Sequence, residues 1–193
     1  MLCGPRLSIP SSILLCVLSP ALAHAPLHDW RFLVLQEYVV QRLDHQRLKD
    51  GFVVLRQLLQ IDIDHFKSIN DRFGHDIGDQ VIRRVAQILR EIGAATATAG
   101  RLGGEEFAVL MPGHGIAGAA VAAHRIRGQC AADTVPGLPD LRFTASIGLS
   151  EWVPGDTVDS LLKRADVALY AAKRGGRDRV AVAGPDMEPA MVG

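Results

Sequence analysis

Two stretches of β-forming residues, 97–102 and 106–111, are separated only by Gly103, Gly104 and Glu105. A glycine pair between two such stretches is a strong signal for a tight hairpin, because glycine readily adopts the positive φ angles that short turns need. The chain therefore contains two neighbouring antiparallel strands with acidic residues at their tip. A hairpin of this kind argues against the strict strand–helix alternation of a doubly wound fold.

Further strands and amphipathic helices surround this hairpin. Apolar residues at strand or helix spacing predict strands at 55–63, 142–150 and 179–183, and helices at 77–92, 116–130 and 158–174. Residues 65 onward, up to the first of these helices, are expected to form a polar loop. The order of elements predicts an α+β fold, in which helices flank a central and mostly antiparallel sheet.

The chain divides near residue 50. We expect a divergent N-terminal segment at 1–50, one domain at 51–183 and a loose tail at 184–193. Residues 29–50 of the first segment can form an amphipathic helix.

The apolar run at 9–23 is too short, and too interrupted by Pro20, for a membrane span. Its end resembles a secretory cleavage site. We prefer an incidental apolar N-terminus on a cytoplasmic protein, and we keep secretion and inner-membrane attachment as alternatives.

The balance of charge limits the class of partner. Lys and Arg together number 21, as do Asp and Glu, so the formal net charge is zero. A protein that binds nucleic acid through its phosphates normally carries a basic excess, so nucleic acid is not expected as a partner. A local phosphate site is compatible with this balance, because it needs only a few cationic groups.

Two carboxylates lie at the end of the first predicted strand. Asp62 and Asp64 are two residues apart, so on a strand both point to the same face, with Ile63 on the other. Carboxylates at a strand end are natural ligands for Mg²⁺, which prefers hard oxygen atoms and shares them with substrate phosphates. A solvated strand end is the alternative interpretation.

A second polar group follows in the predicted loop. Asn70 and Asp79 together can read guanine, because the amide and the carboxylate complement its edge, and His75 lies between them. Asp79 also suits the first turn of a helix, where a negative charge is favoured. Lys67, Lys173 and Arg177 could neutralise a triphosphate, although each alone is more typical of a solvated surface.

Four segments together resemble the GGDEF family of diguanylate cyclases, in its GGEEF variant. They are IDIDHFKSINDRFGHDIGDQVI, RLGGEEFAVLMP, FTASIGLS and LLKRADVALYAAKRGGRDRV, which fall within about residues 58–182. The resemblance implies a fold similar to the palm of nucleotidyl cyclases and polymerases. It also implies the condensation of two GTP molecules into cyclic di-GMP, a bacterial second messenger, with release of two pyrophosphates.

The resemblance also implies roles for individual residues. Catalysis would fall to Glu105 as proton acceptor and Lys67 as a transition-state contact. Metal ions, Mg²⁺ or alternatively Mn²⁺, would be held by Asp62, Glu105 and the backbone carbonyl of Ile63, with Glu106 as a further acidic position. GTP would contact Asn70, His75, Asp79, Lys173 and Arg177. Each protomer would hold one GTP, so a homodimer is required.

Two departures from the family pattern affect the expected activity. Ala94 to Ala97 replace the charged positions of the family's inhibitory Arg-x-x-Asp site, so we expect no product inhibition of that kind. Residues 24–50 do not match the segment that usually opens the family domain. This second departure keeps open an alternative function, a catalytically silent module that binds GTP or mediates dimerisation. A secreted protein of another role is the third alternative.

Overall fold

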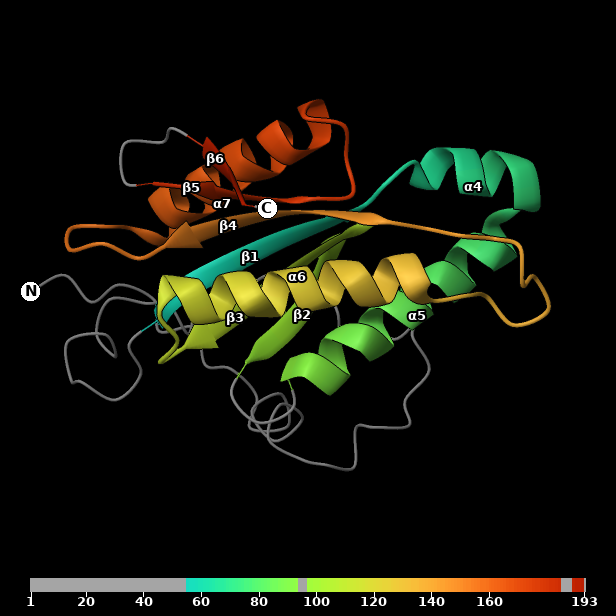
Figure 1. Ribbon diagram of the computed structural model, residues 1–193, viewed down its shortest axis with the longest axis horizontal. Coiled ribbons are helices and arrows are strands. Elements are labelled where there is room, and N and C mark those ends of the chain that lie inside the picture. The colour runs from blue at the N-terminus through green and yellow to red at the C-terminus, as the bar shows by residue number, and fades with distance from the viewer. Residues whose placement is uncertain (1–54, 94–96, 185–188, 193) are drawn as a thin grey trace, which may run out of the picture. The chain divides into compact units, whose positions relative to one another are not determined.

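The structure, a computed structural model, describes residues 55–93, 97–184 and 189–192. Its six strands form one sheet in the order β2-β3-β1-β4-β5-β6 (Figure 1). The strands are β1 (Leu55–Ile63), β2 (Thr98–Gly103), β3 (Glu106–Pro112), β4 (Ala145–Glu151), β5 (Val180–Ala183) and β6 (Pro189–Val192). Only β4 and β5 pair in parallel, and the other neighbours are antiparallel. The expected α+β fold is confirmed.

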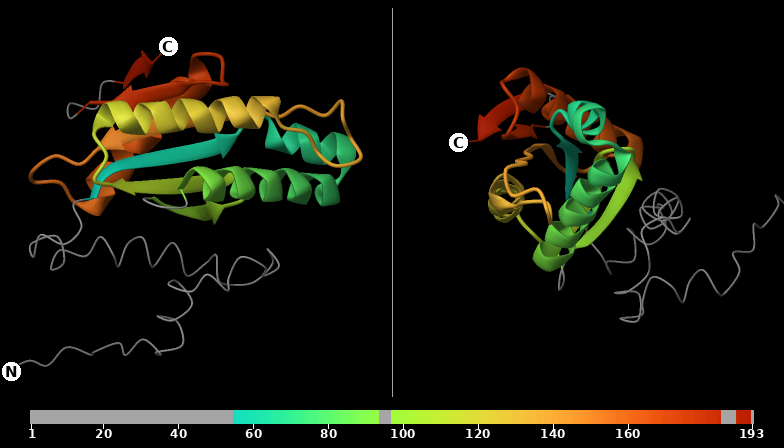
Figure 2. Two further views of the ribbon diagram at one scale, coloured as in Figure 1. Left: turned by 60° about the horizontal axis from the view of Figure 1, so that its bottom comes forward. Right: turned by 90° about the vertical axis from the view of Figure 1, so that its right-hand side faces the viewer.

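Four helices accompany the sheet in the described part of the chain: α4 (Phe66–Phe73), α5 (His75–Gly93), α6 (Ile116–Ala132) and α7 (Val158–Arg174). Side chains alternate along the central strand β1, so its two faces meet different helices. Leu59, Ile61 and Ile63 belong to the large core formed with α5 and α6. Leu58 belongs to a smaller core formed with α7. Figures 1 and 2 show α5 and α6 side by side on one side of the sheet.

Helix α7 packs directly on the backbone of β4. A Cβ atom added at Gly148 would lie 2.2 Å from the carbonyl oxygen of Ala165 and 2.3 Å from the backbone nitrogen of Leu169. Only glycine fits at this crossing, which explains the glycine inside an otherwise regular strand. The close approach sets the height of α7 above the sheet, and so places the C-terminal end of the helix beside the end of β1.

The structure corrects the polar loop expected after residue 64. Residues Phe66–Phe73 form helix α4, Gly74 ends it at a φ of 86°, and α5 already begins at His75. Phe66, Ile69 and Phe73 give α4 an apolar side that joins the large core, with Ile69 buried. Most of the polar residues that suggested a loop lie on the solvated side of this short helix: Lys67, Ser68, Asp71 and Arg72.

Other boundaries differ less. Helix α7 has the predicted bounds, whereas β4 begins at Ala145 instead of residue 142. The loose tail is wrong for Pro189–Val192, which pairs with β5 as an antiparallel edge strand. The apolar run at 9–23 and the predicted helix at 29–50 lie outside the described residues. No helix among the described residues is both long and apolar enough to cross a bilayer.

Candidate active site

The predicted site residues come from segments that meet at one end of the sheet. Figure 1 shows α4, the start of α5 and the loop after α7 at the end where β1 finishes. Asp62 of β1 lies opposite Glu106 of β3, and the Ile63 backbone nitrogen donates to the Glu105 carbonyl oxygen at 3.3 Å. The Gly-Gly-Glu-Glu turn therefore lies directly beside the end of β1.

The turn has a fixed shape. Gly104 has a φ of 49°, a left-handed conformation that costs glycine little. The guanidinium of Arg101 donates from Nε to the Gly104 carbonyl oxygen at 2.7 Å. This bond closes the turn and restrains the backbone that carries the side chains of Glu105 and Glu106.

Asp62, Glu105 and Glu106 form an acidic group at the end of β1, and Asp62 is the member that pairs with Lys173. The Nζ of Lys173 lies 2.8 Å from its Oδ2, and the Asp62 side chain is only 10% exposed. Burial raises the pKa of Asp62; Lys173 opposes this effect, while Glu105 and Asp64 add to it. Burial also raises the pKa of Glu106, and the charge of Asp62 raises it further. The negative charges here exceed what Lys173 alone can neutralise.

This excess fits a divalent cation. The donor set consists of hard oxygen atoms, which Mg²⁺ prefers: the carboxylates of Asp62, Glu105 and Glu106 and the nearby carbonyl of Ile63. Within the described residues, however, no three His, Cys, Asp or Glu side chains lie close enough to hold a metal ion by themselves. A cation bound here would take further ligands from substrate phosphates and water, as magnesium commonly does.

Asp64 has a different environment from Asp62. It is 3% exposed. Its carboxylate accepts hydrogen bonds from Thr144 Oγ1 at 2.7 Å, Ser146 Oγ at 2.7 Å and the Asp178 backbone nitrogen at 3.0 Å. Three of its roughly four acceptor positions are thus occupied. The two carboxylates that the sequence grouped as metal ligands are separated by their hydrogen bonding.

The start of α4 is a feature that the sequence analysis missed, because this segment was expected to be a loop. His65 precedes the helix at a φ of 55° and provides no side-chain cap. The first N–H groups of a helix lack intrahelical partners, and they favour anions such as phosphate. Lys67, which is exposed, stands in this first turn. The apolar spacing of Phe66, Ile69 and Phe73 is the signal that could have revealed the helix.

The candidate guanine residues lie on α4 and α5. The Oδ1 atom of Asn70 is buried and has no hydrogen-bond partner in the described structure. It would lie 1.9 Å from a Cβ at Gly78, so a glycine is needed there. His75 and Asp79 are exposed on α5. Because α5 begins at His75, Asp79 lies beyond the first turn, and Asp76 is the acidic residue within that turn.

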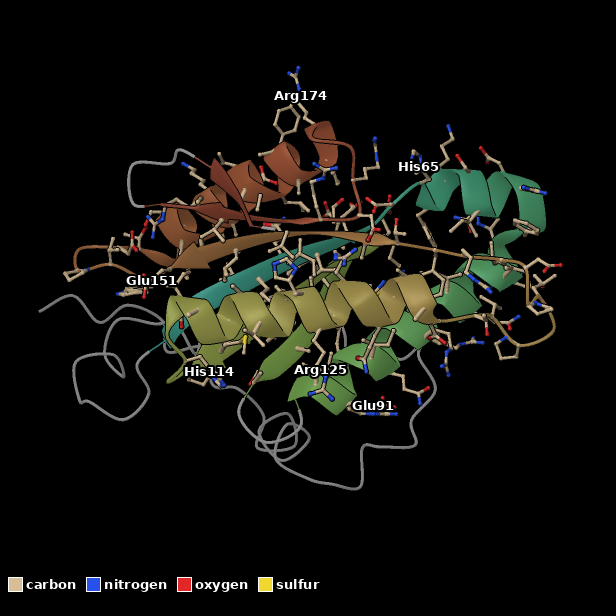
Figure 3. The ribbon with its side chains drawn as sticks, viewed as in Figure 1. His65, Glu91, His114, Arg125, Glu151 and Arg174 are labelled. Carbon is tan, nitrogen blue, oxygen red and sulfur yellow. The ribbon has the colours of Figure 1, made fainter. Side chains whose placement is uncertain are left out.

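The cations in the last turn of α7 and in the loop after it are oriented differently from one another. Lys173 reaches back to Asp62, whereas Arg174 stacks on the Tyr170 ring at 5.9 Å and points away from the sheet (Figure 3). Arg177 is exposed and has a φ of 63°. Figure 3 also shows His65 at this end of the molecule, with Glu151 at the opposite end.

The family model for the GGDEF domain of diguanylate cyclases matches residues 32–179. The chain belongs to the GGDEF family. The match starts upstream of residue 51, where the sequence suggested that the domain begins.

Known relatives agree with this family assignment. The chain is 42% identical over 127 residues to the diguanylate cyclase VdcA of Vibrio cholerae, covering 64% of this chain and 38% of VdcA. It is 47% identical over 126 residues to the response regulator PleD of Caulobacter vibrioides, covering 63% of this chain and 28% of PleD. The match thus spans between about a quarter and two fifths of the length of these two proteins.

Solved structures share the fold. The active GGEEF domain of a Vibrio cholerae diguanylate cyclase superposes with a TM-score of 0.69 at 31% identity, covering 76% of this chain and 94% of that one. The GGDEF domain of DgcB from Caulobacter crescentus, solved in complex with c-di-GMP, gives a TM-score of 0.69 at 37% identity, covering 76% of this chain and 87% of that one.

Proposed function

We propose that this chain is a diguanylate cyclase, which condenses two GTP molecules into cyclic di-GMP and two pyrophosphates. The observation that carries the proposal is the end of β1, where Asp62 lies opposite Glu106, beside the turn of Glu105, and pairs with Lys173. An acidic group of this kind suits a divalent cation, and the cations around it suit a triphosphate.

The cation that we propose is Mg²⁺, with Mn²⁺ as the alternative. Asp62, Glu105 and the carbonyl of Ile63 would hold it, with Glu106 as a further acidic group. Bound there, the ion would withdraw charge from the phosphate and lower the pKa of the attacking hydroxyl. The raised pKa values of Asp62 and Glu106 agree with this role, because burial and neighbouring acids disfavour their charged forms, which a bound cation would favour.

The nucleotide would lie between the acidic group and α4. Lys67, Lys173 and Arg177 would neutralise the triphosphate, and the uncapped start of α4 adds N–H donors for its oxygen atoms. Asn70 and Asp79 would hydrogen-bond the guanine, with His75 nearby. The unpartnered amide of Asn70 supports this position, because a buried polar group without a partner is costly unless a ligand supplies one.

The reaction needs two copies of the site. Glu105 would accept the proton of the 3′-hydroxyl, whose oxygen forms a bond to the α-phosphorus of the GTP in the partner protomer. The bond from that phosphorus to the bridging oxygen breaks, pyrophosphate leaves, and Lys67 steadies the charge that develops. Each protomer supplies one GTP, so we propose a homodimer that closes the cyclic product in two such steps.

The proposal extends to the organisation of the chain. Residues 51–183 would form the catalytic domain, preceded by the divergent segment 1–50. Because GTP is its substrate, the domain would work in the cytoplasm, and attachment to the inner membrane through the N-terminal segment is a compatible arrangement.

Product formation tests the proposed function. The purified chain is incubated with GTP and Mg²⁺ beside the Glu105→Ala variant, and cyclic di-GMP is measured by chromatography. We expect product from the parent and a loss of at least about 100-fold in the variant, since several kcal/mol of transition-state stabilisation are removed. Glu91→Ala is the matched control, because Glu91 is exposed near the C-terminal end of α5 (Figure 3).

Two results would overturn the proposal. No product from a folded, dimeric parent would favour the silent GTP-binding module. Equal loss in Glu91→Ala would show that the effect of Glu105→Ala is not specific to the site.

A further inference from the structure

The loop after α7 contains three successive residues with positive φ angles. Gly176 has a φ of 117°, Arg177 of 63° and Asp178 of 44°. Glycine adopts such angles freely, but the other two residues carry a Cβ atom and are strained there. A strained turn persists only where its surroundings hold it in place, so the contacts of this turn indicate what the fold maintains.

Two side chains from distant elements hold the turn. Asp64, at the end of β1, accepts a hydrogen bond from the Asp178 backbone nitrogen at 3.0 Å, across 114 residues of sequence. Arg127, on α6, donates from Nη1 to Asp178 Oδ1 at 2.9 Å. The turn is therefore fixed to the central strand on one side and to a helix on the other.

The Asp64 carboxylate is itself held by other groups. Thr144 and Ser146 each donate a hydroxyl hydrogen bond to it at 2.7 Å, and the residue is 3% exposed. A buried carboxylate with two such donors has one orientation, and in that orientation it presents Oδ2 to the Asp178 N–H. Hydrogen bonds to an ionised acceptor are about twice as strong as neutral ones.

This arrangement joins the two halves of the proposed substrate site. Asp64 directly follows Ile63, the last residue of β1, and the turn that it holds contains Arg177 and begins soon after Lys173. We propose that Asp64 is a positioning residue, which keeps Arg177 and Lys173 in place over the end of β1 for the triphosphate of the substrate. This inference rests on the proposed function, since it assumes that the site takes a nucleoside triphosphate.

Nucleotide binding tests the role of Asp64. The dissociation constants of 3′-deoxy-GTP, which lacks the attacking hydroxyl, and of GMP are measured by calorimetry with Mg²⁺. Asp64→Ala is expected to weaken 3′-deoxy-GTP binding by about 10-fold or more, the size typical of losing a group that orients a site. GMP binding is expected to stay within about threefold, because GMP lacks the two outer phosphates. The matched control is Asp156→Ala, a buried carboxylate at the other end of α7.

The Asp64→Asn variant separates positioning from metal binding. An asparagine can keep its oxygen towards Thr144 and the Asp178 N–H, while its amide group donates to the hydroxyl of Ser146. We therefore expect Asp64→Asn to bind 3′-deoxy-GTP within about threefold of the parent. Binding as weak as that of Asp64→Ala would mean that the negative charge itself is needed, and would overturn the positioning role.

Hydrogen exchange tests the contact without nucleotide. The Asp178 amide is expected to exchange more than about 10-fold faster in Asp64→Ala than in the parent or in Glu91→Ala, which removes an exposed acid elsewhere in the fold. Unchanged exchange would overturn the anchor. Faster exchange with unchanged 3′-deoxy-GTP affinity would overturn its role in phosphate binding. A parent that binds neither nucleotide would instead sink the proposed function, and the phosphate role with it.

Discussion

An ion pair lies at each end of α7, and the two pairs differ in their burial and in their hydrogen bonding. At the N-terminal end, Arg164 meets Asp156 with both side chains 5% exposed. At the C-terminal end, Lys173 meets Asp62 with the lysine 31% exposed and the aspartate 10% exposed. One helix thus joins a closed, fully buried pair to a pair that is partly open to solvent.

The hydrogen bonding around the two acids differs as well. Burial alone would raise the pKa of Asp156, but hydrogen bonds from Arg164, the Val153 backbone and Ser160 outweigh it and lower the pKa to about 2. For Asp62, burial outweighs the single contact with Lys173, and the pKa is raised.

This difference separates a structural pair from the pair at the proposed active site. Asp156 has all the partners that its charge needs, so the Arg164 pair joins the loop before α7 to the helix. Burial and further acids nearby disfavour the charged form of Asp62, and the contact with Lys173 offsets this only in part. A site with more negative than positive charge favours the binding of a cation. Active sites commonly have such unfavourable charge arrangements, which lower stability in return for activity.

The largest expected effect comes from breaking the closed pair. Asp156→Ala leaves the Arg164 guanidinium buried without its partner, which typically costs about 3–5 kcal/mol of unfolding free energy. The midpoint of urea unfolding should fall accordingly. Cyclic di-GMP formation per folded molecule should stay within about twofold, because Asp156 lies at the far end of α7 from the proposed site.

The double variant Asp156→Ala/Arg164→Met checks the cause of this loss. It removes the unpaired charge as well, so part of the lost stability should return, as found when buried ion pairs are replaced by apolar residues. A single variant that loses less than about 1 kcal/mol would mean that water reaches the pair and that the contrast with Asp62 is wrong.

The second effect falls on activity instead of stability. Asp62→Asn keeps the size of the side chain but removes its charge, so cyclic di-GMP formation should fall by at least about 100-fold. The free energy of unfolding should stay the same or rise slightly, because the charged carboxylate is disfavoured by burial. Unfolding in urea and product formation are measured on the same preparation.

Glu91→Gln is the control for this experiment, since it removes an exposed acid without touching the end of β1. A fall of more than about 1 kcal/mol in the stability of Asp62→Asn would contradict the comparison, because the pair with Lys173 would then be structural like that of Asp156.

The sequence predicts the local elements of the fold better than it predicts the contact between Lys173 and Asp62. The hairpin at Gly103 and Gly104 and the bounds of α7 follow from local spacing, which a short window of sequence contains. The contact of Lys173 with Asp62 depends on α7 crossing β4 at Gly148, which no local pattern reveals. Local spacing is also misleading for α4, where polar residues outnumber the three apolar ones that hold it.

Asp64 shows the same limit at the level of a single residue. Its position two residues after Asp62 predicted a shared face and made it a candidate metal ligand, although the family resemblance assigned only Asp62. Its actual partners, Thr144, Ser146 and Asp178, are contributed by segments far along the chain. Strand periodicity predicts the face of the sheet on which a side chain lies. The hydrogen-bond partners of that side chain, which only the fold brings together, determine its role.

The smallest expected effect is in the acid dependence of stability, and here the two acids should act in opposite directions. The pKa of Asp156 is about 2 in the folded protein against an ordinary value of 3.8. As pH falls, the unfolded chain takes up this proton first, so roughly 2 kcal/mol of stability is lost between about pH 4 and pH 2. The pKa of Asp62 is raised, so the folded protein takes up that proton first, and stability rises as pH falls towards the ordinary value.

Urea unfolding at a series of pH values from about 6 to 2 resolves these two contributions. Asp156→Asn should flatten the loss of stability below about pH 4, and Asp62→Asn should remove the gain above it. If both variants keep the pH profile of the parent, neither acid has the folded pKa that its surroundings dictate. If both change it in the same direction, the two ends of α7 are electrostatically alike, and the shortage of positive charge at Asp62 no longer distinguishes the proposed active site from the rest of the fold.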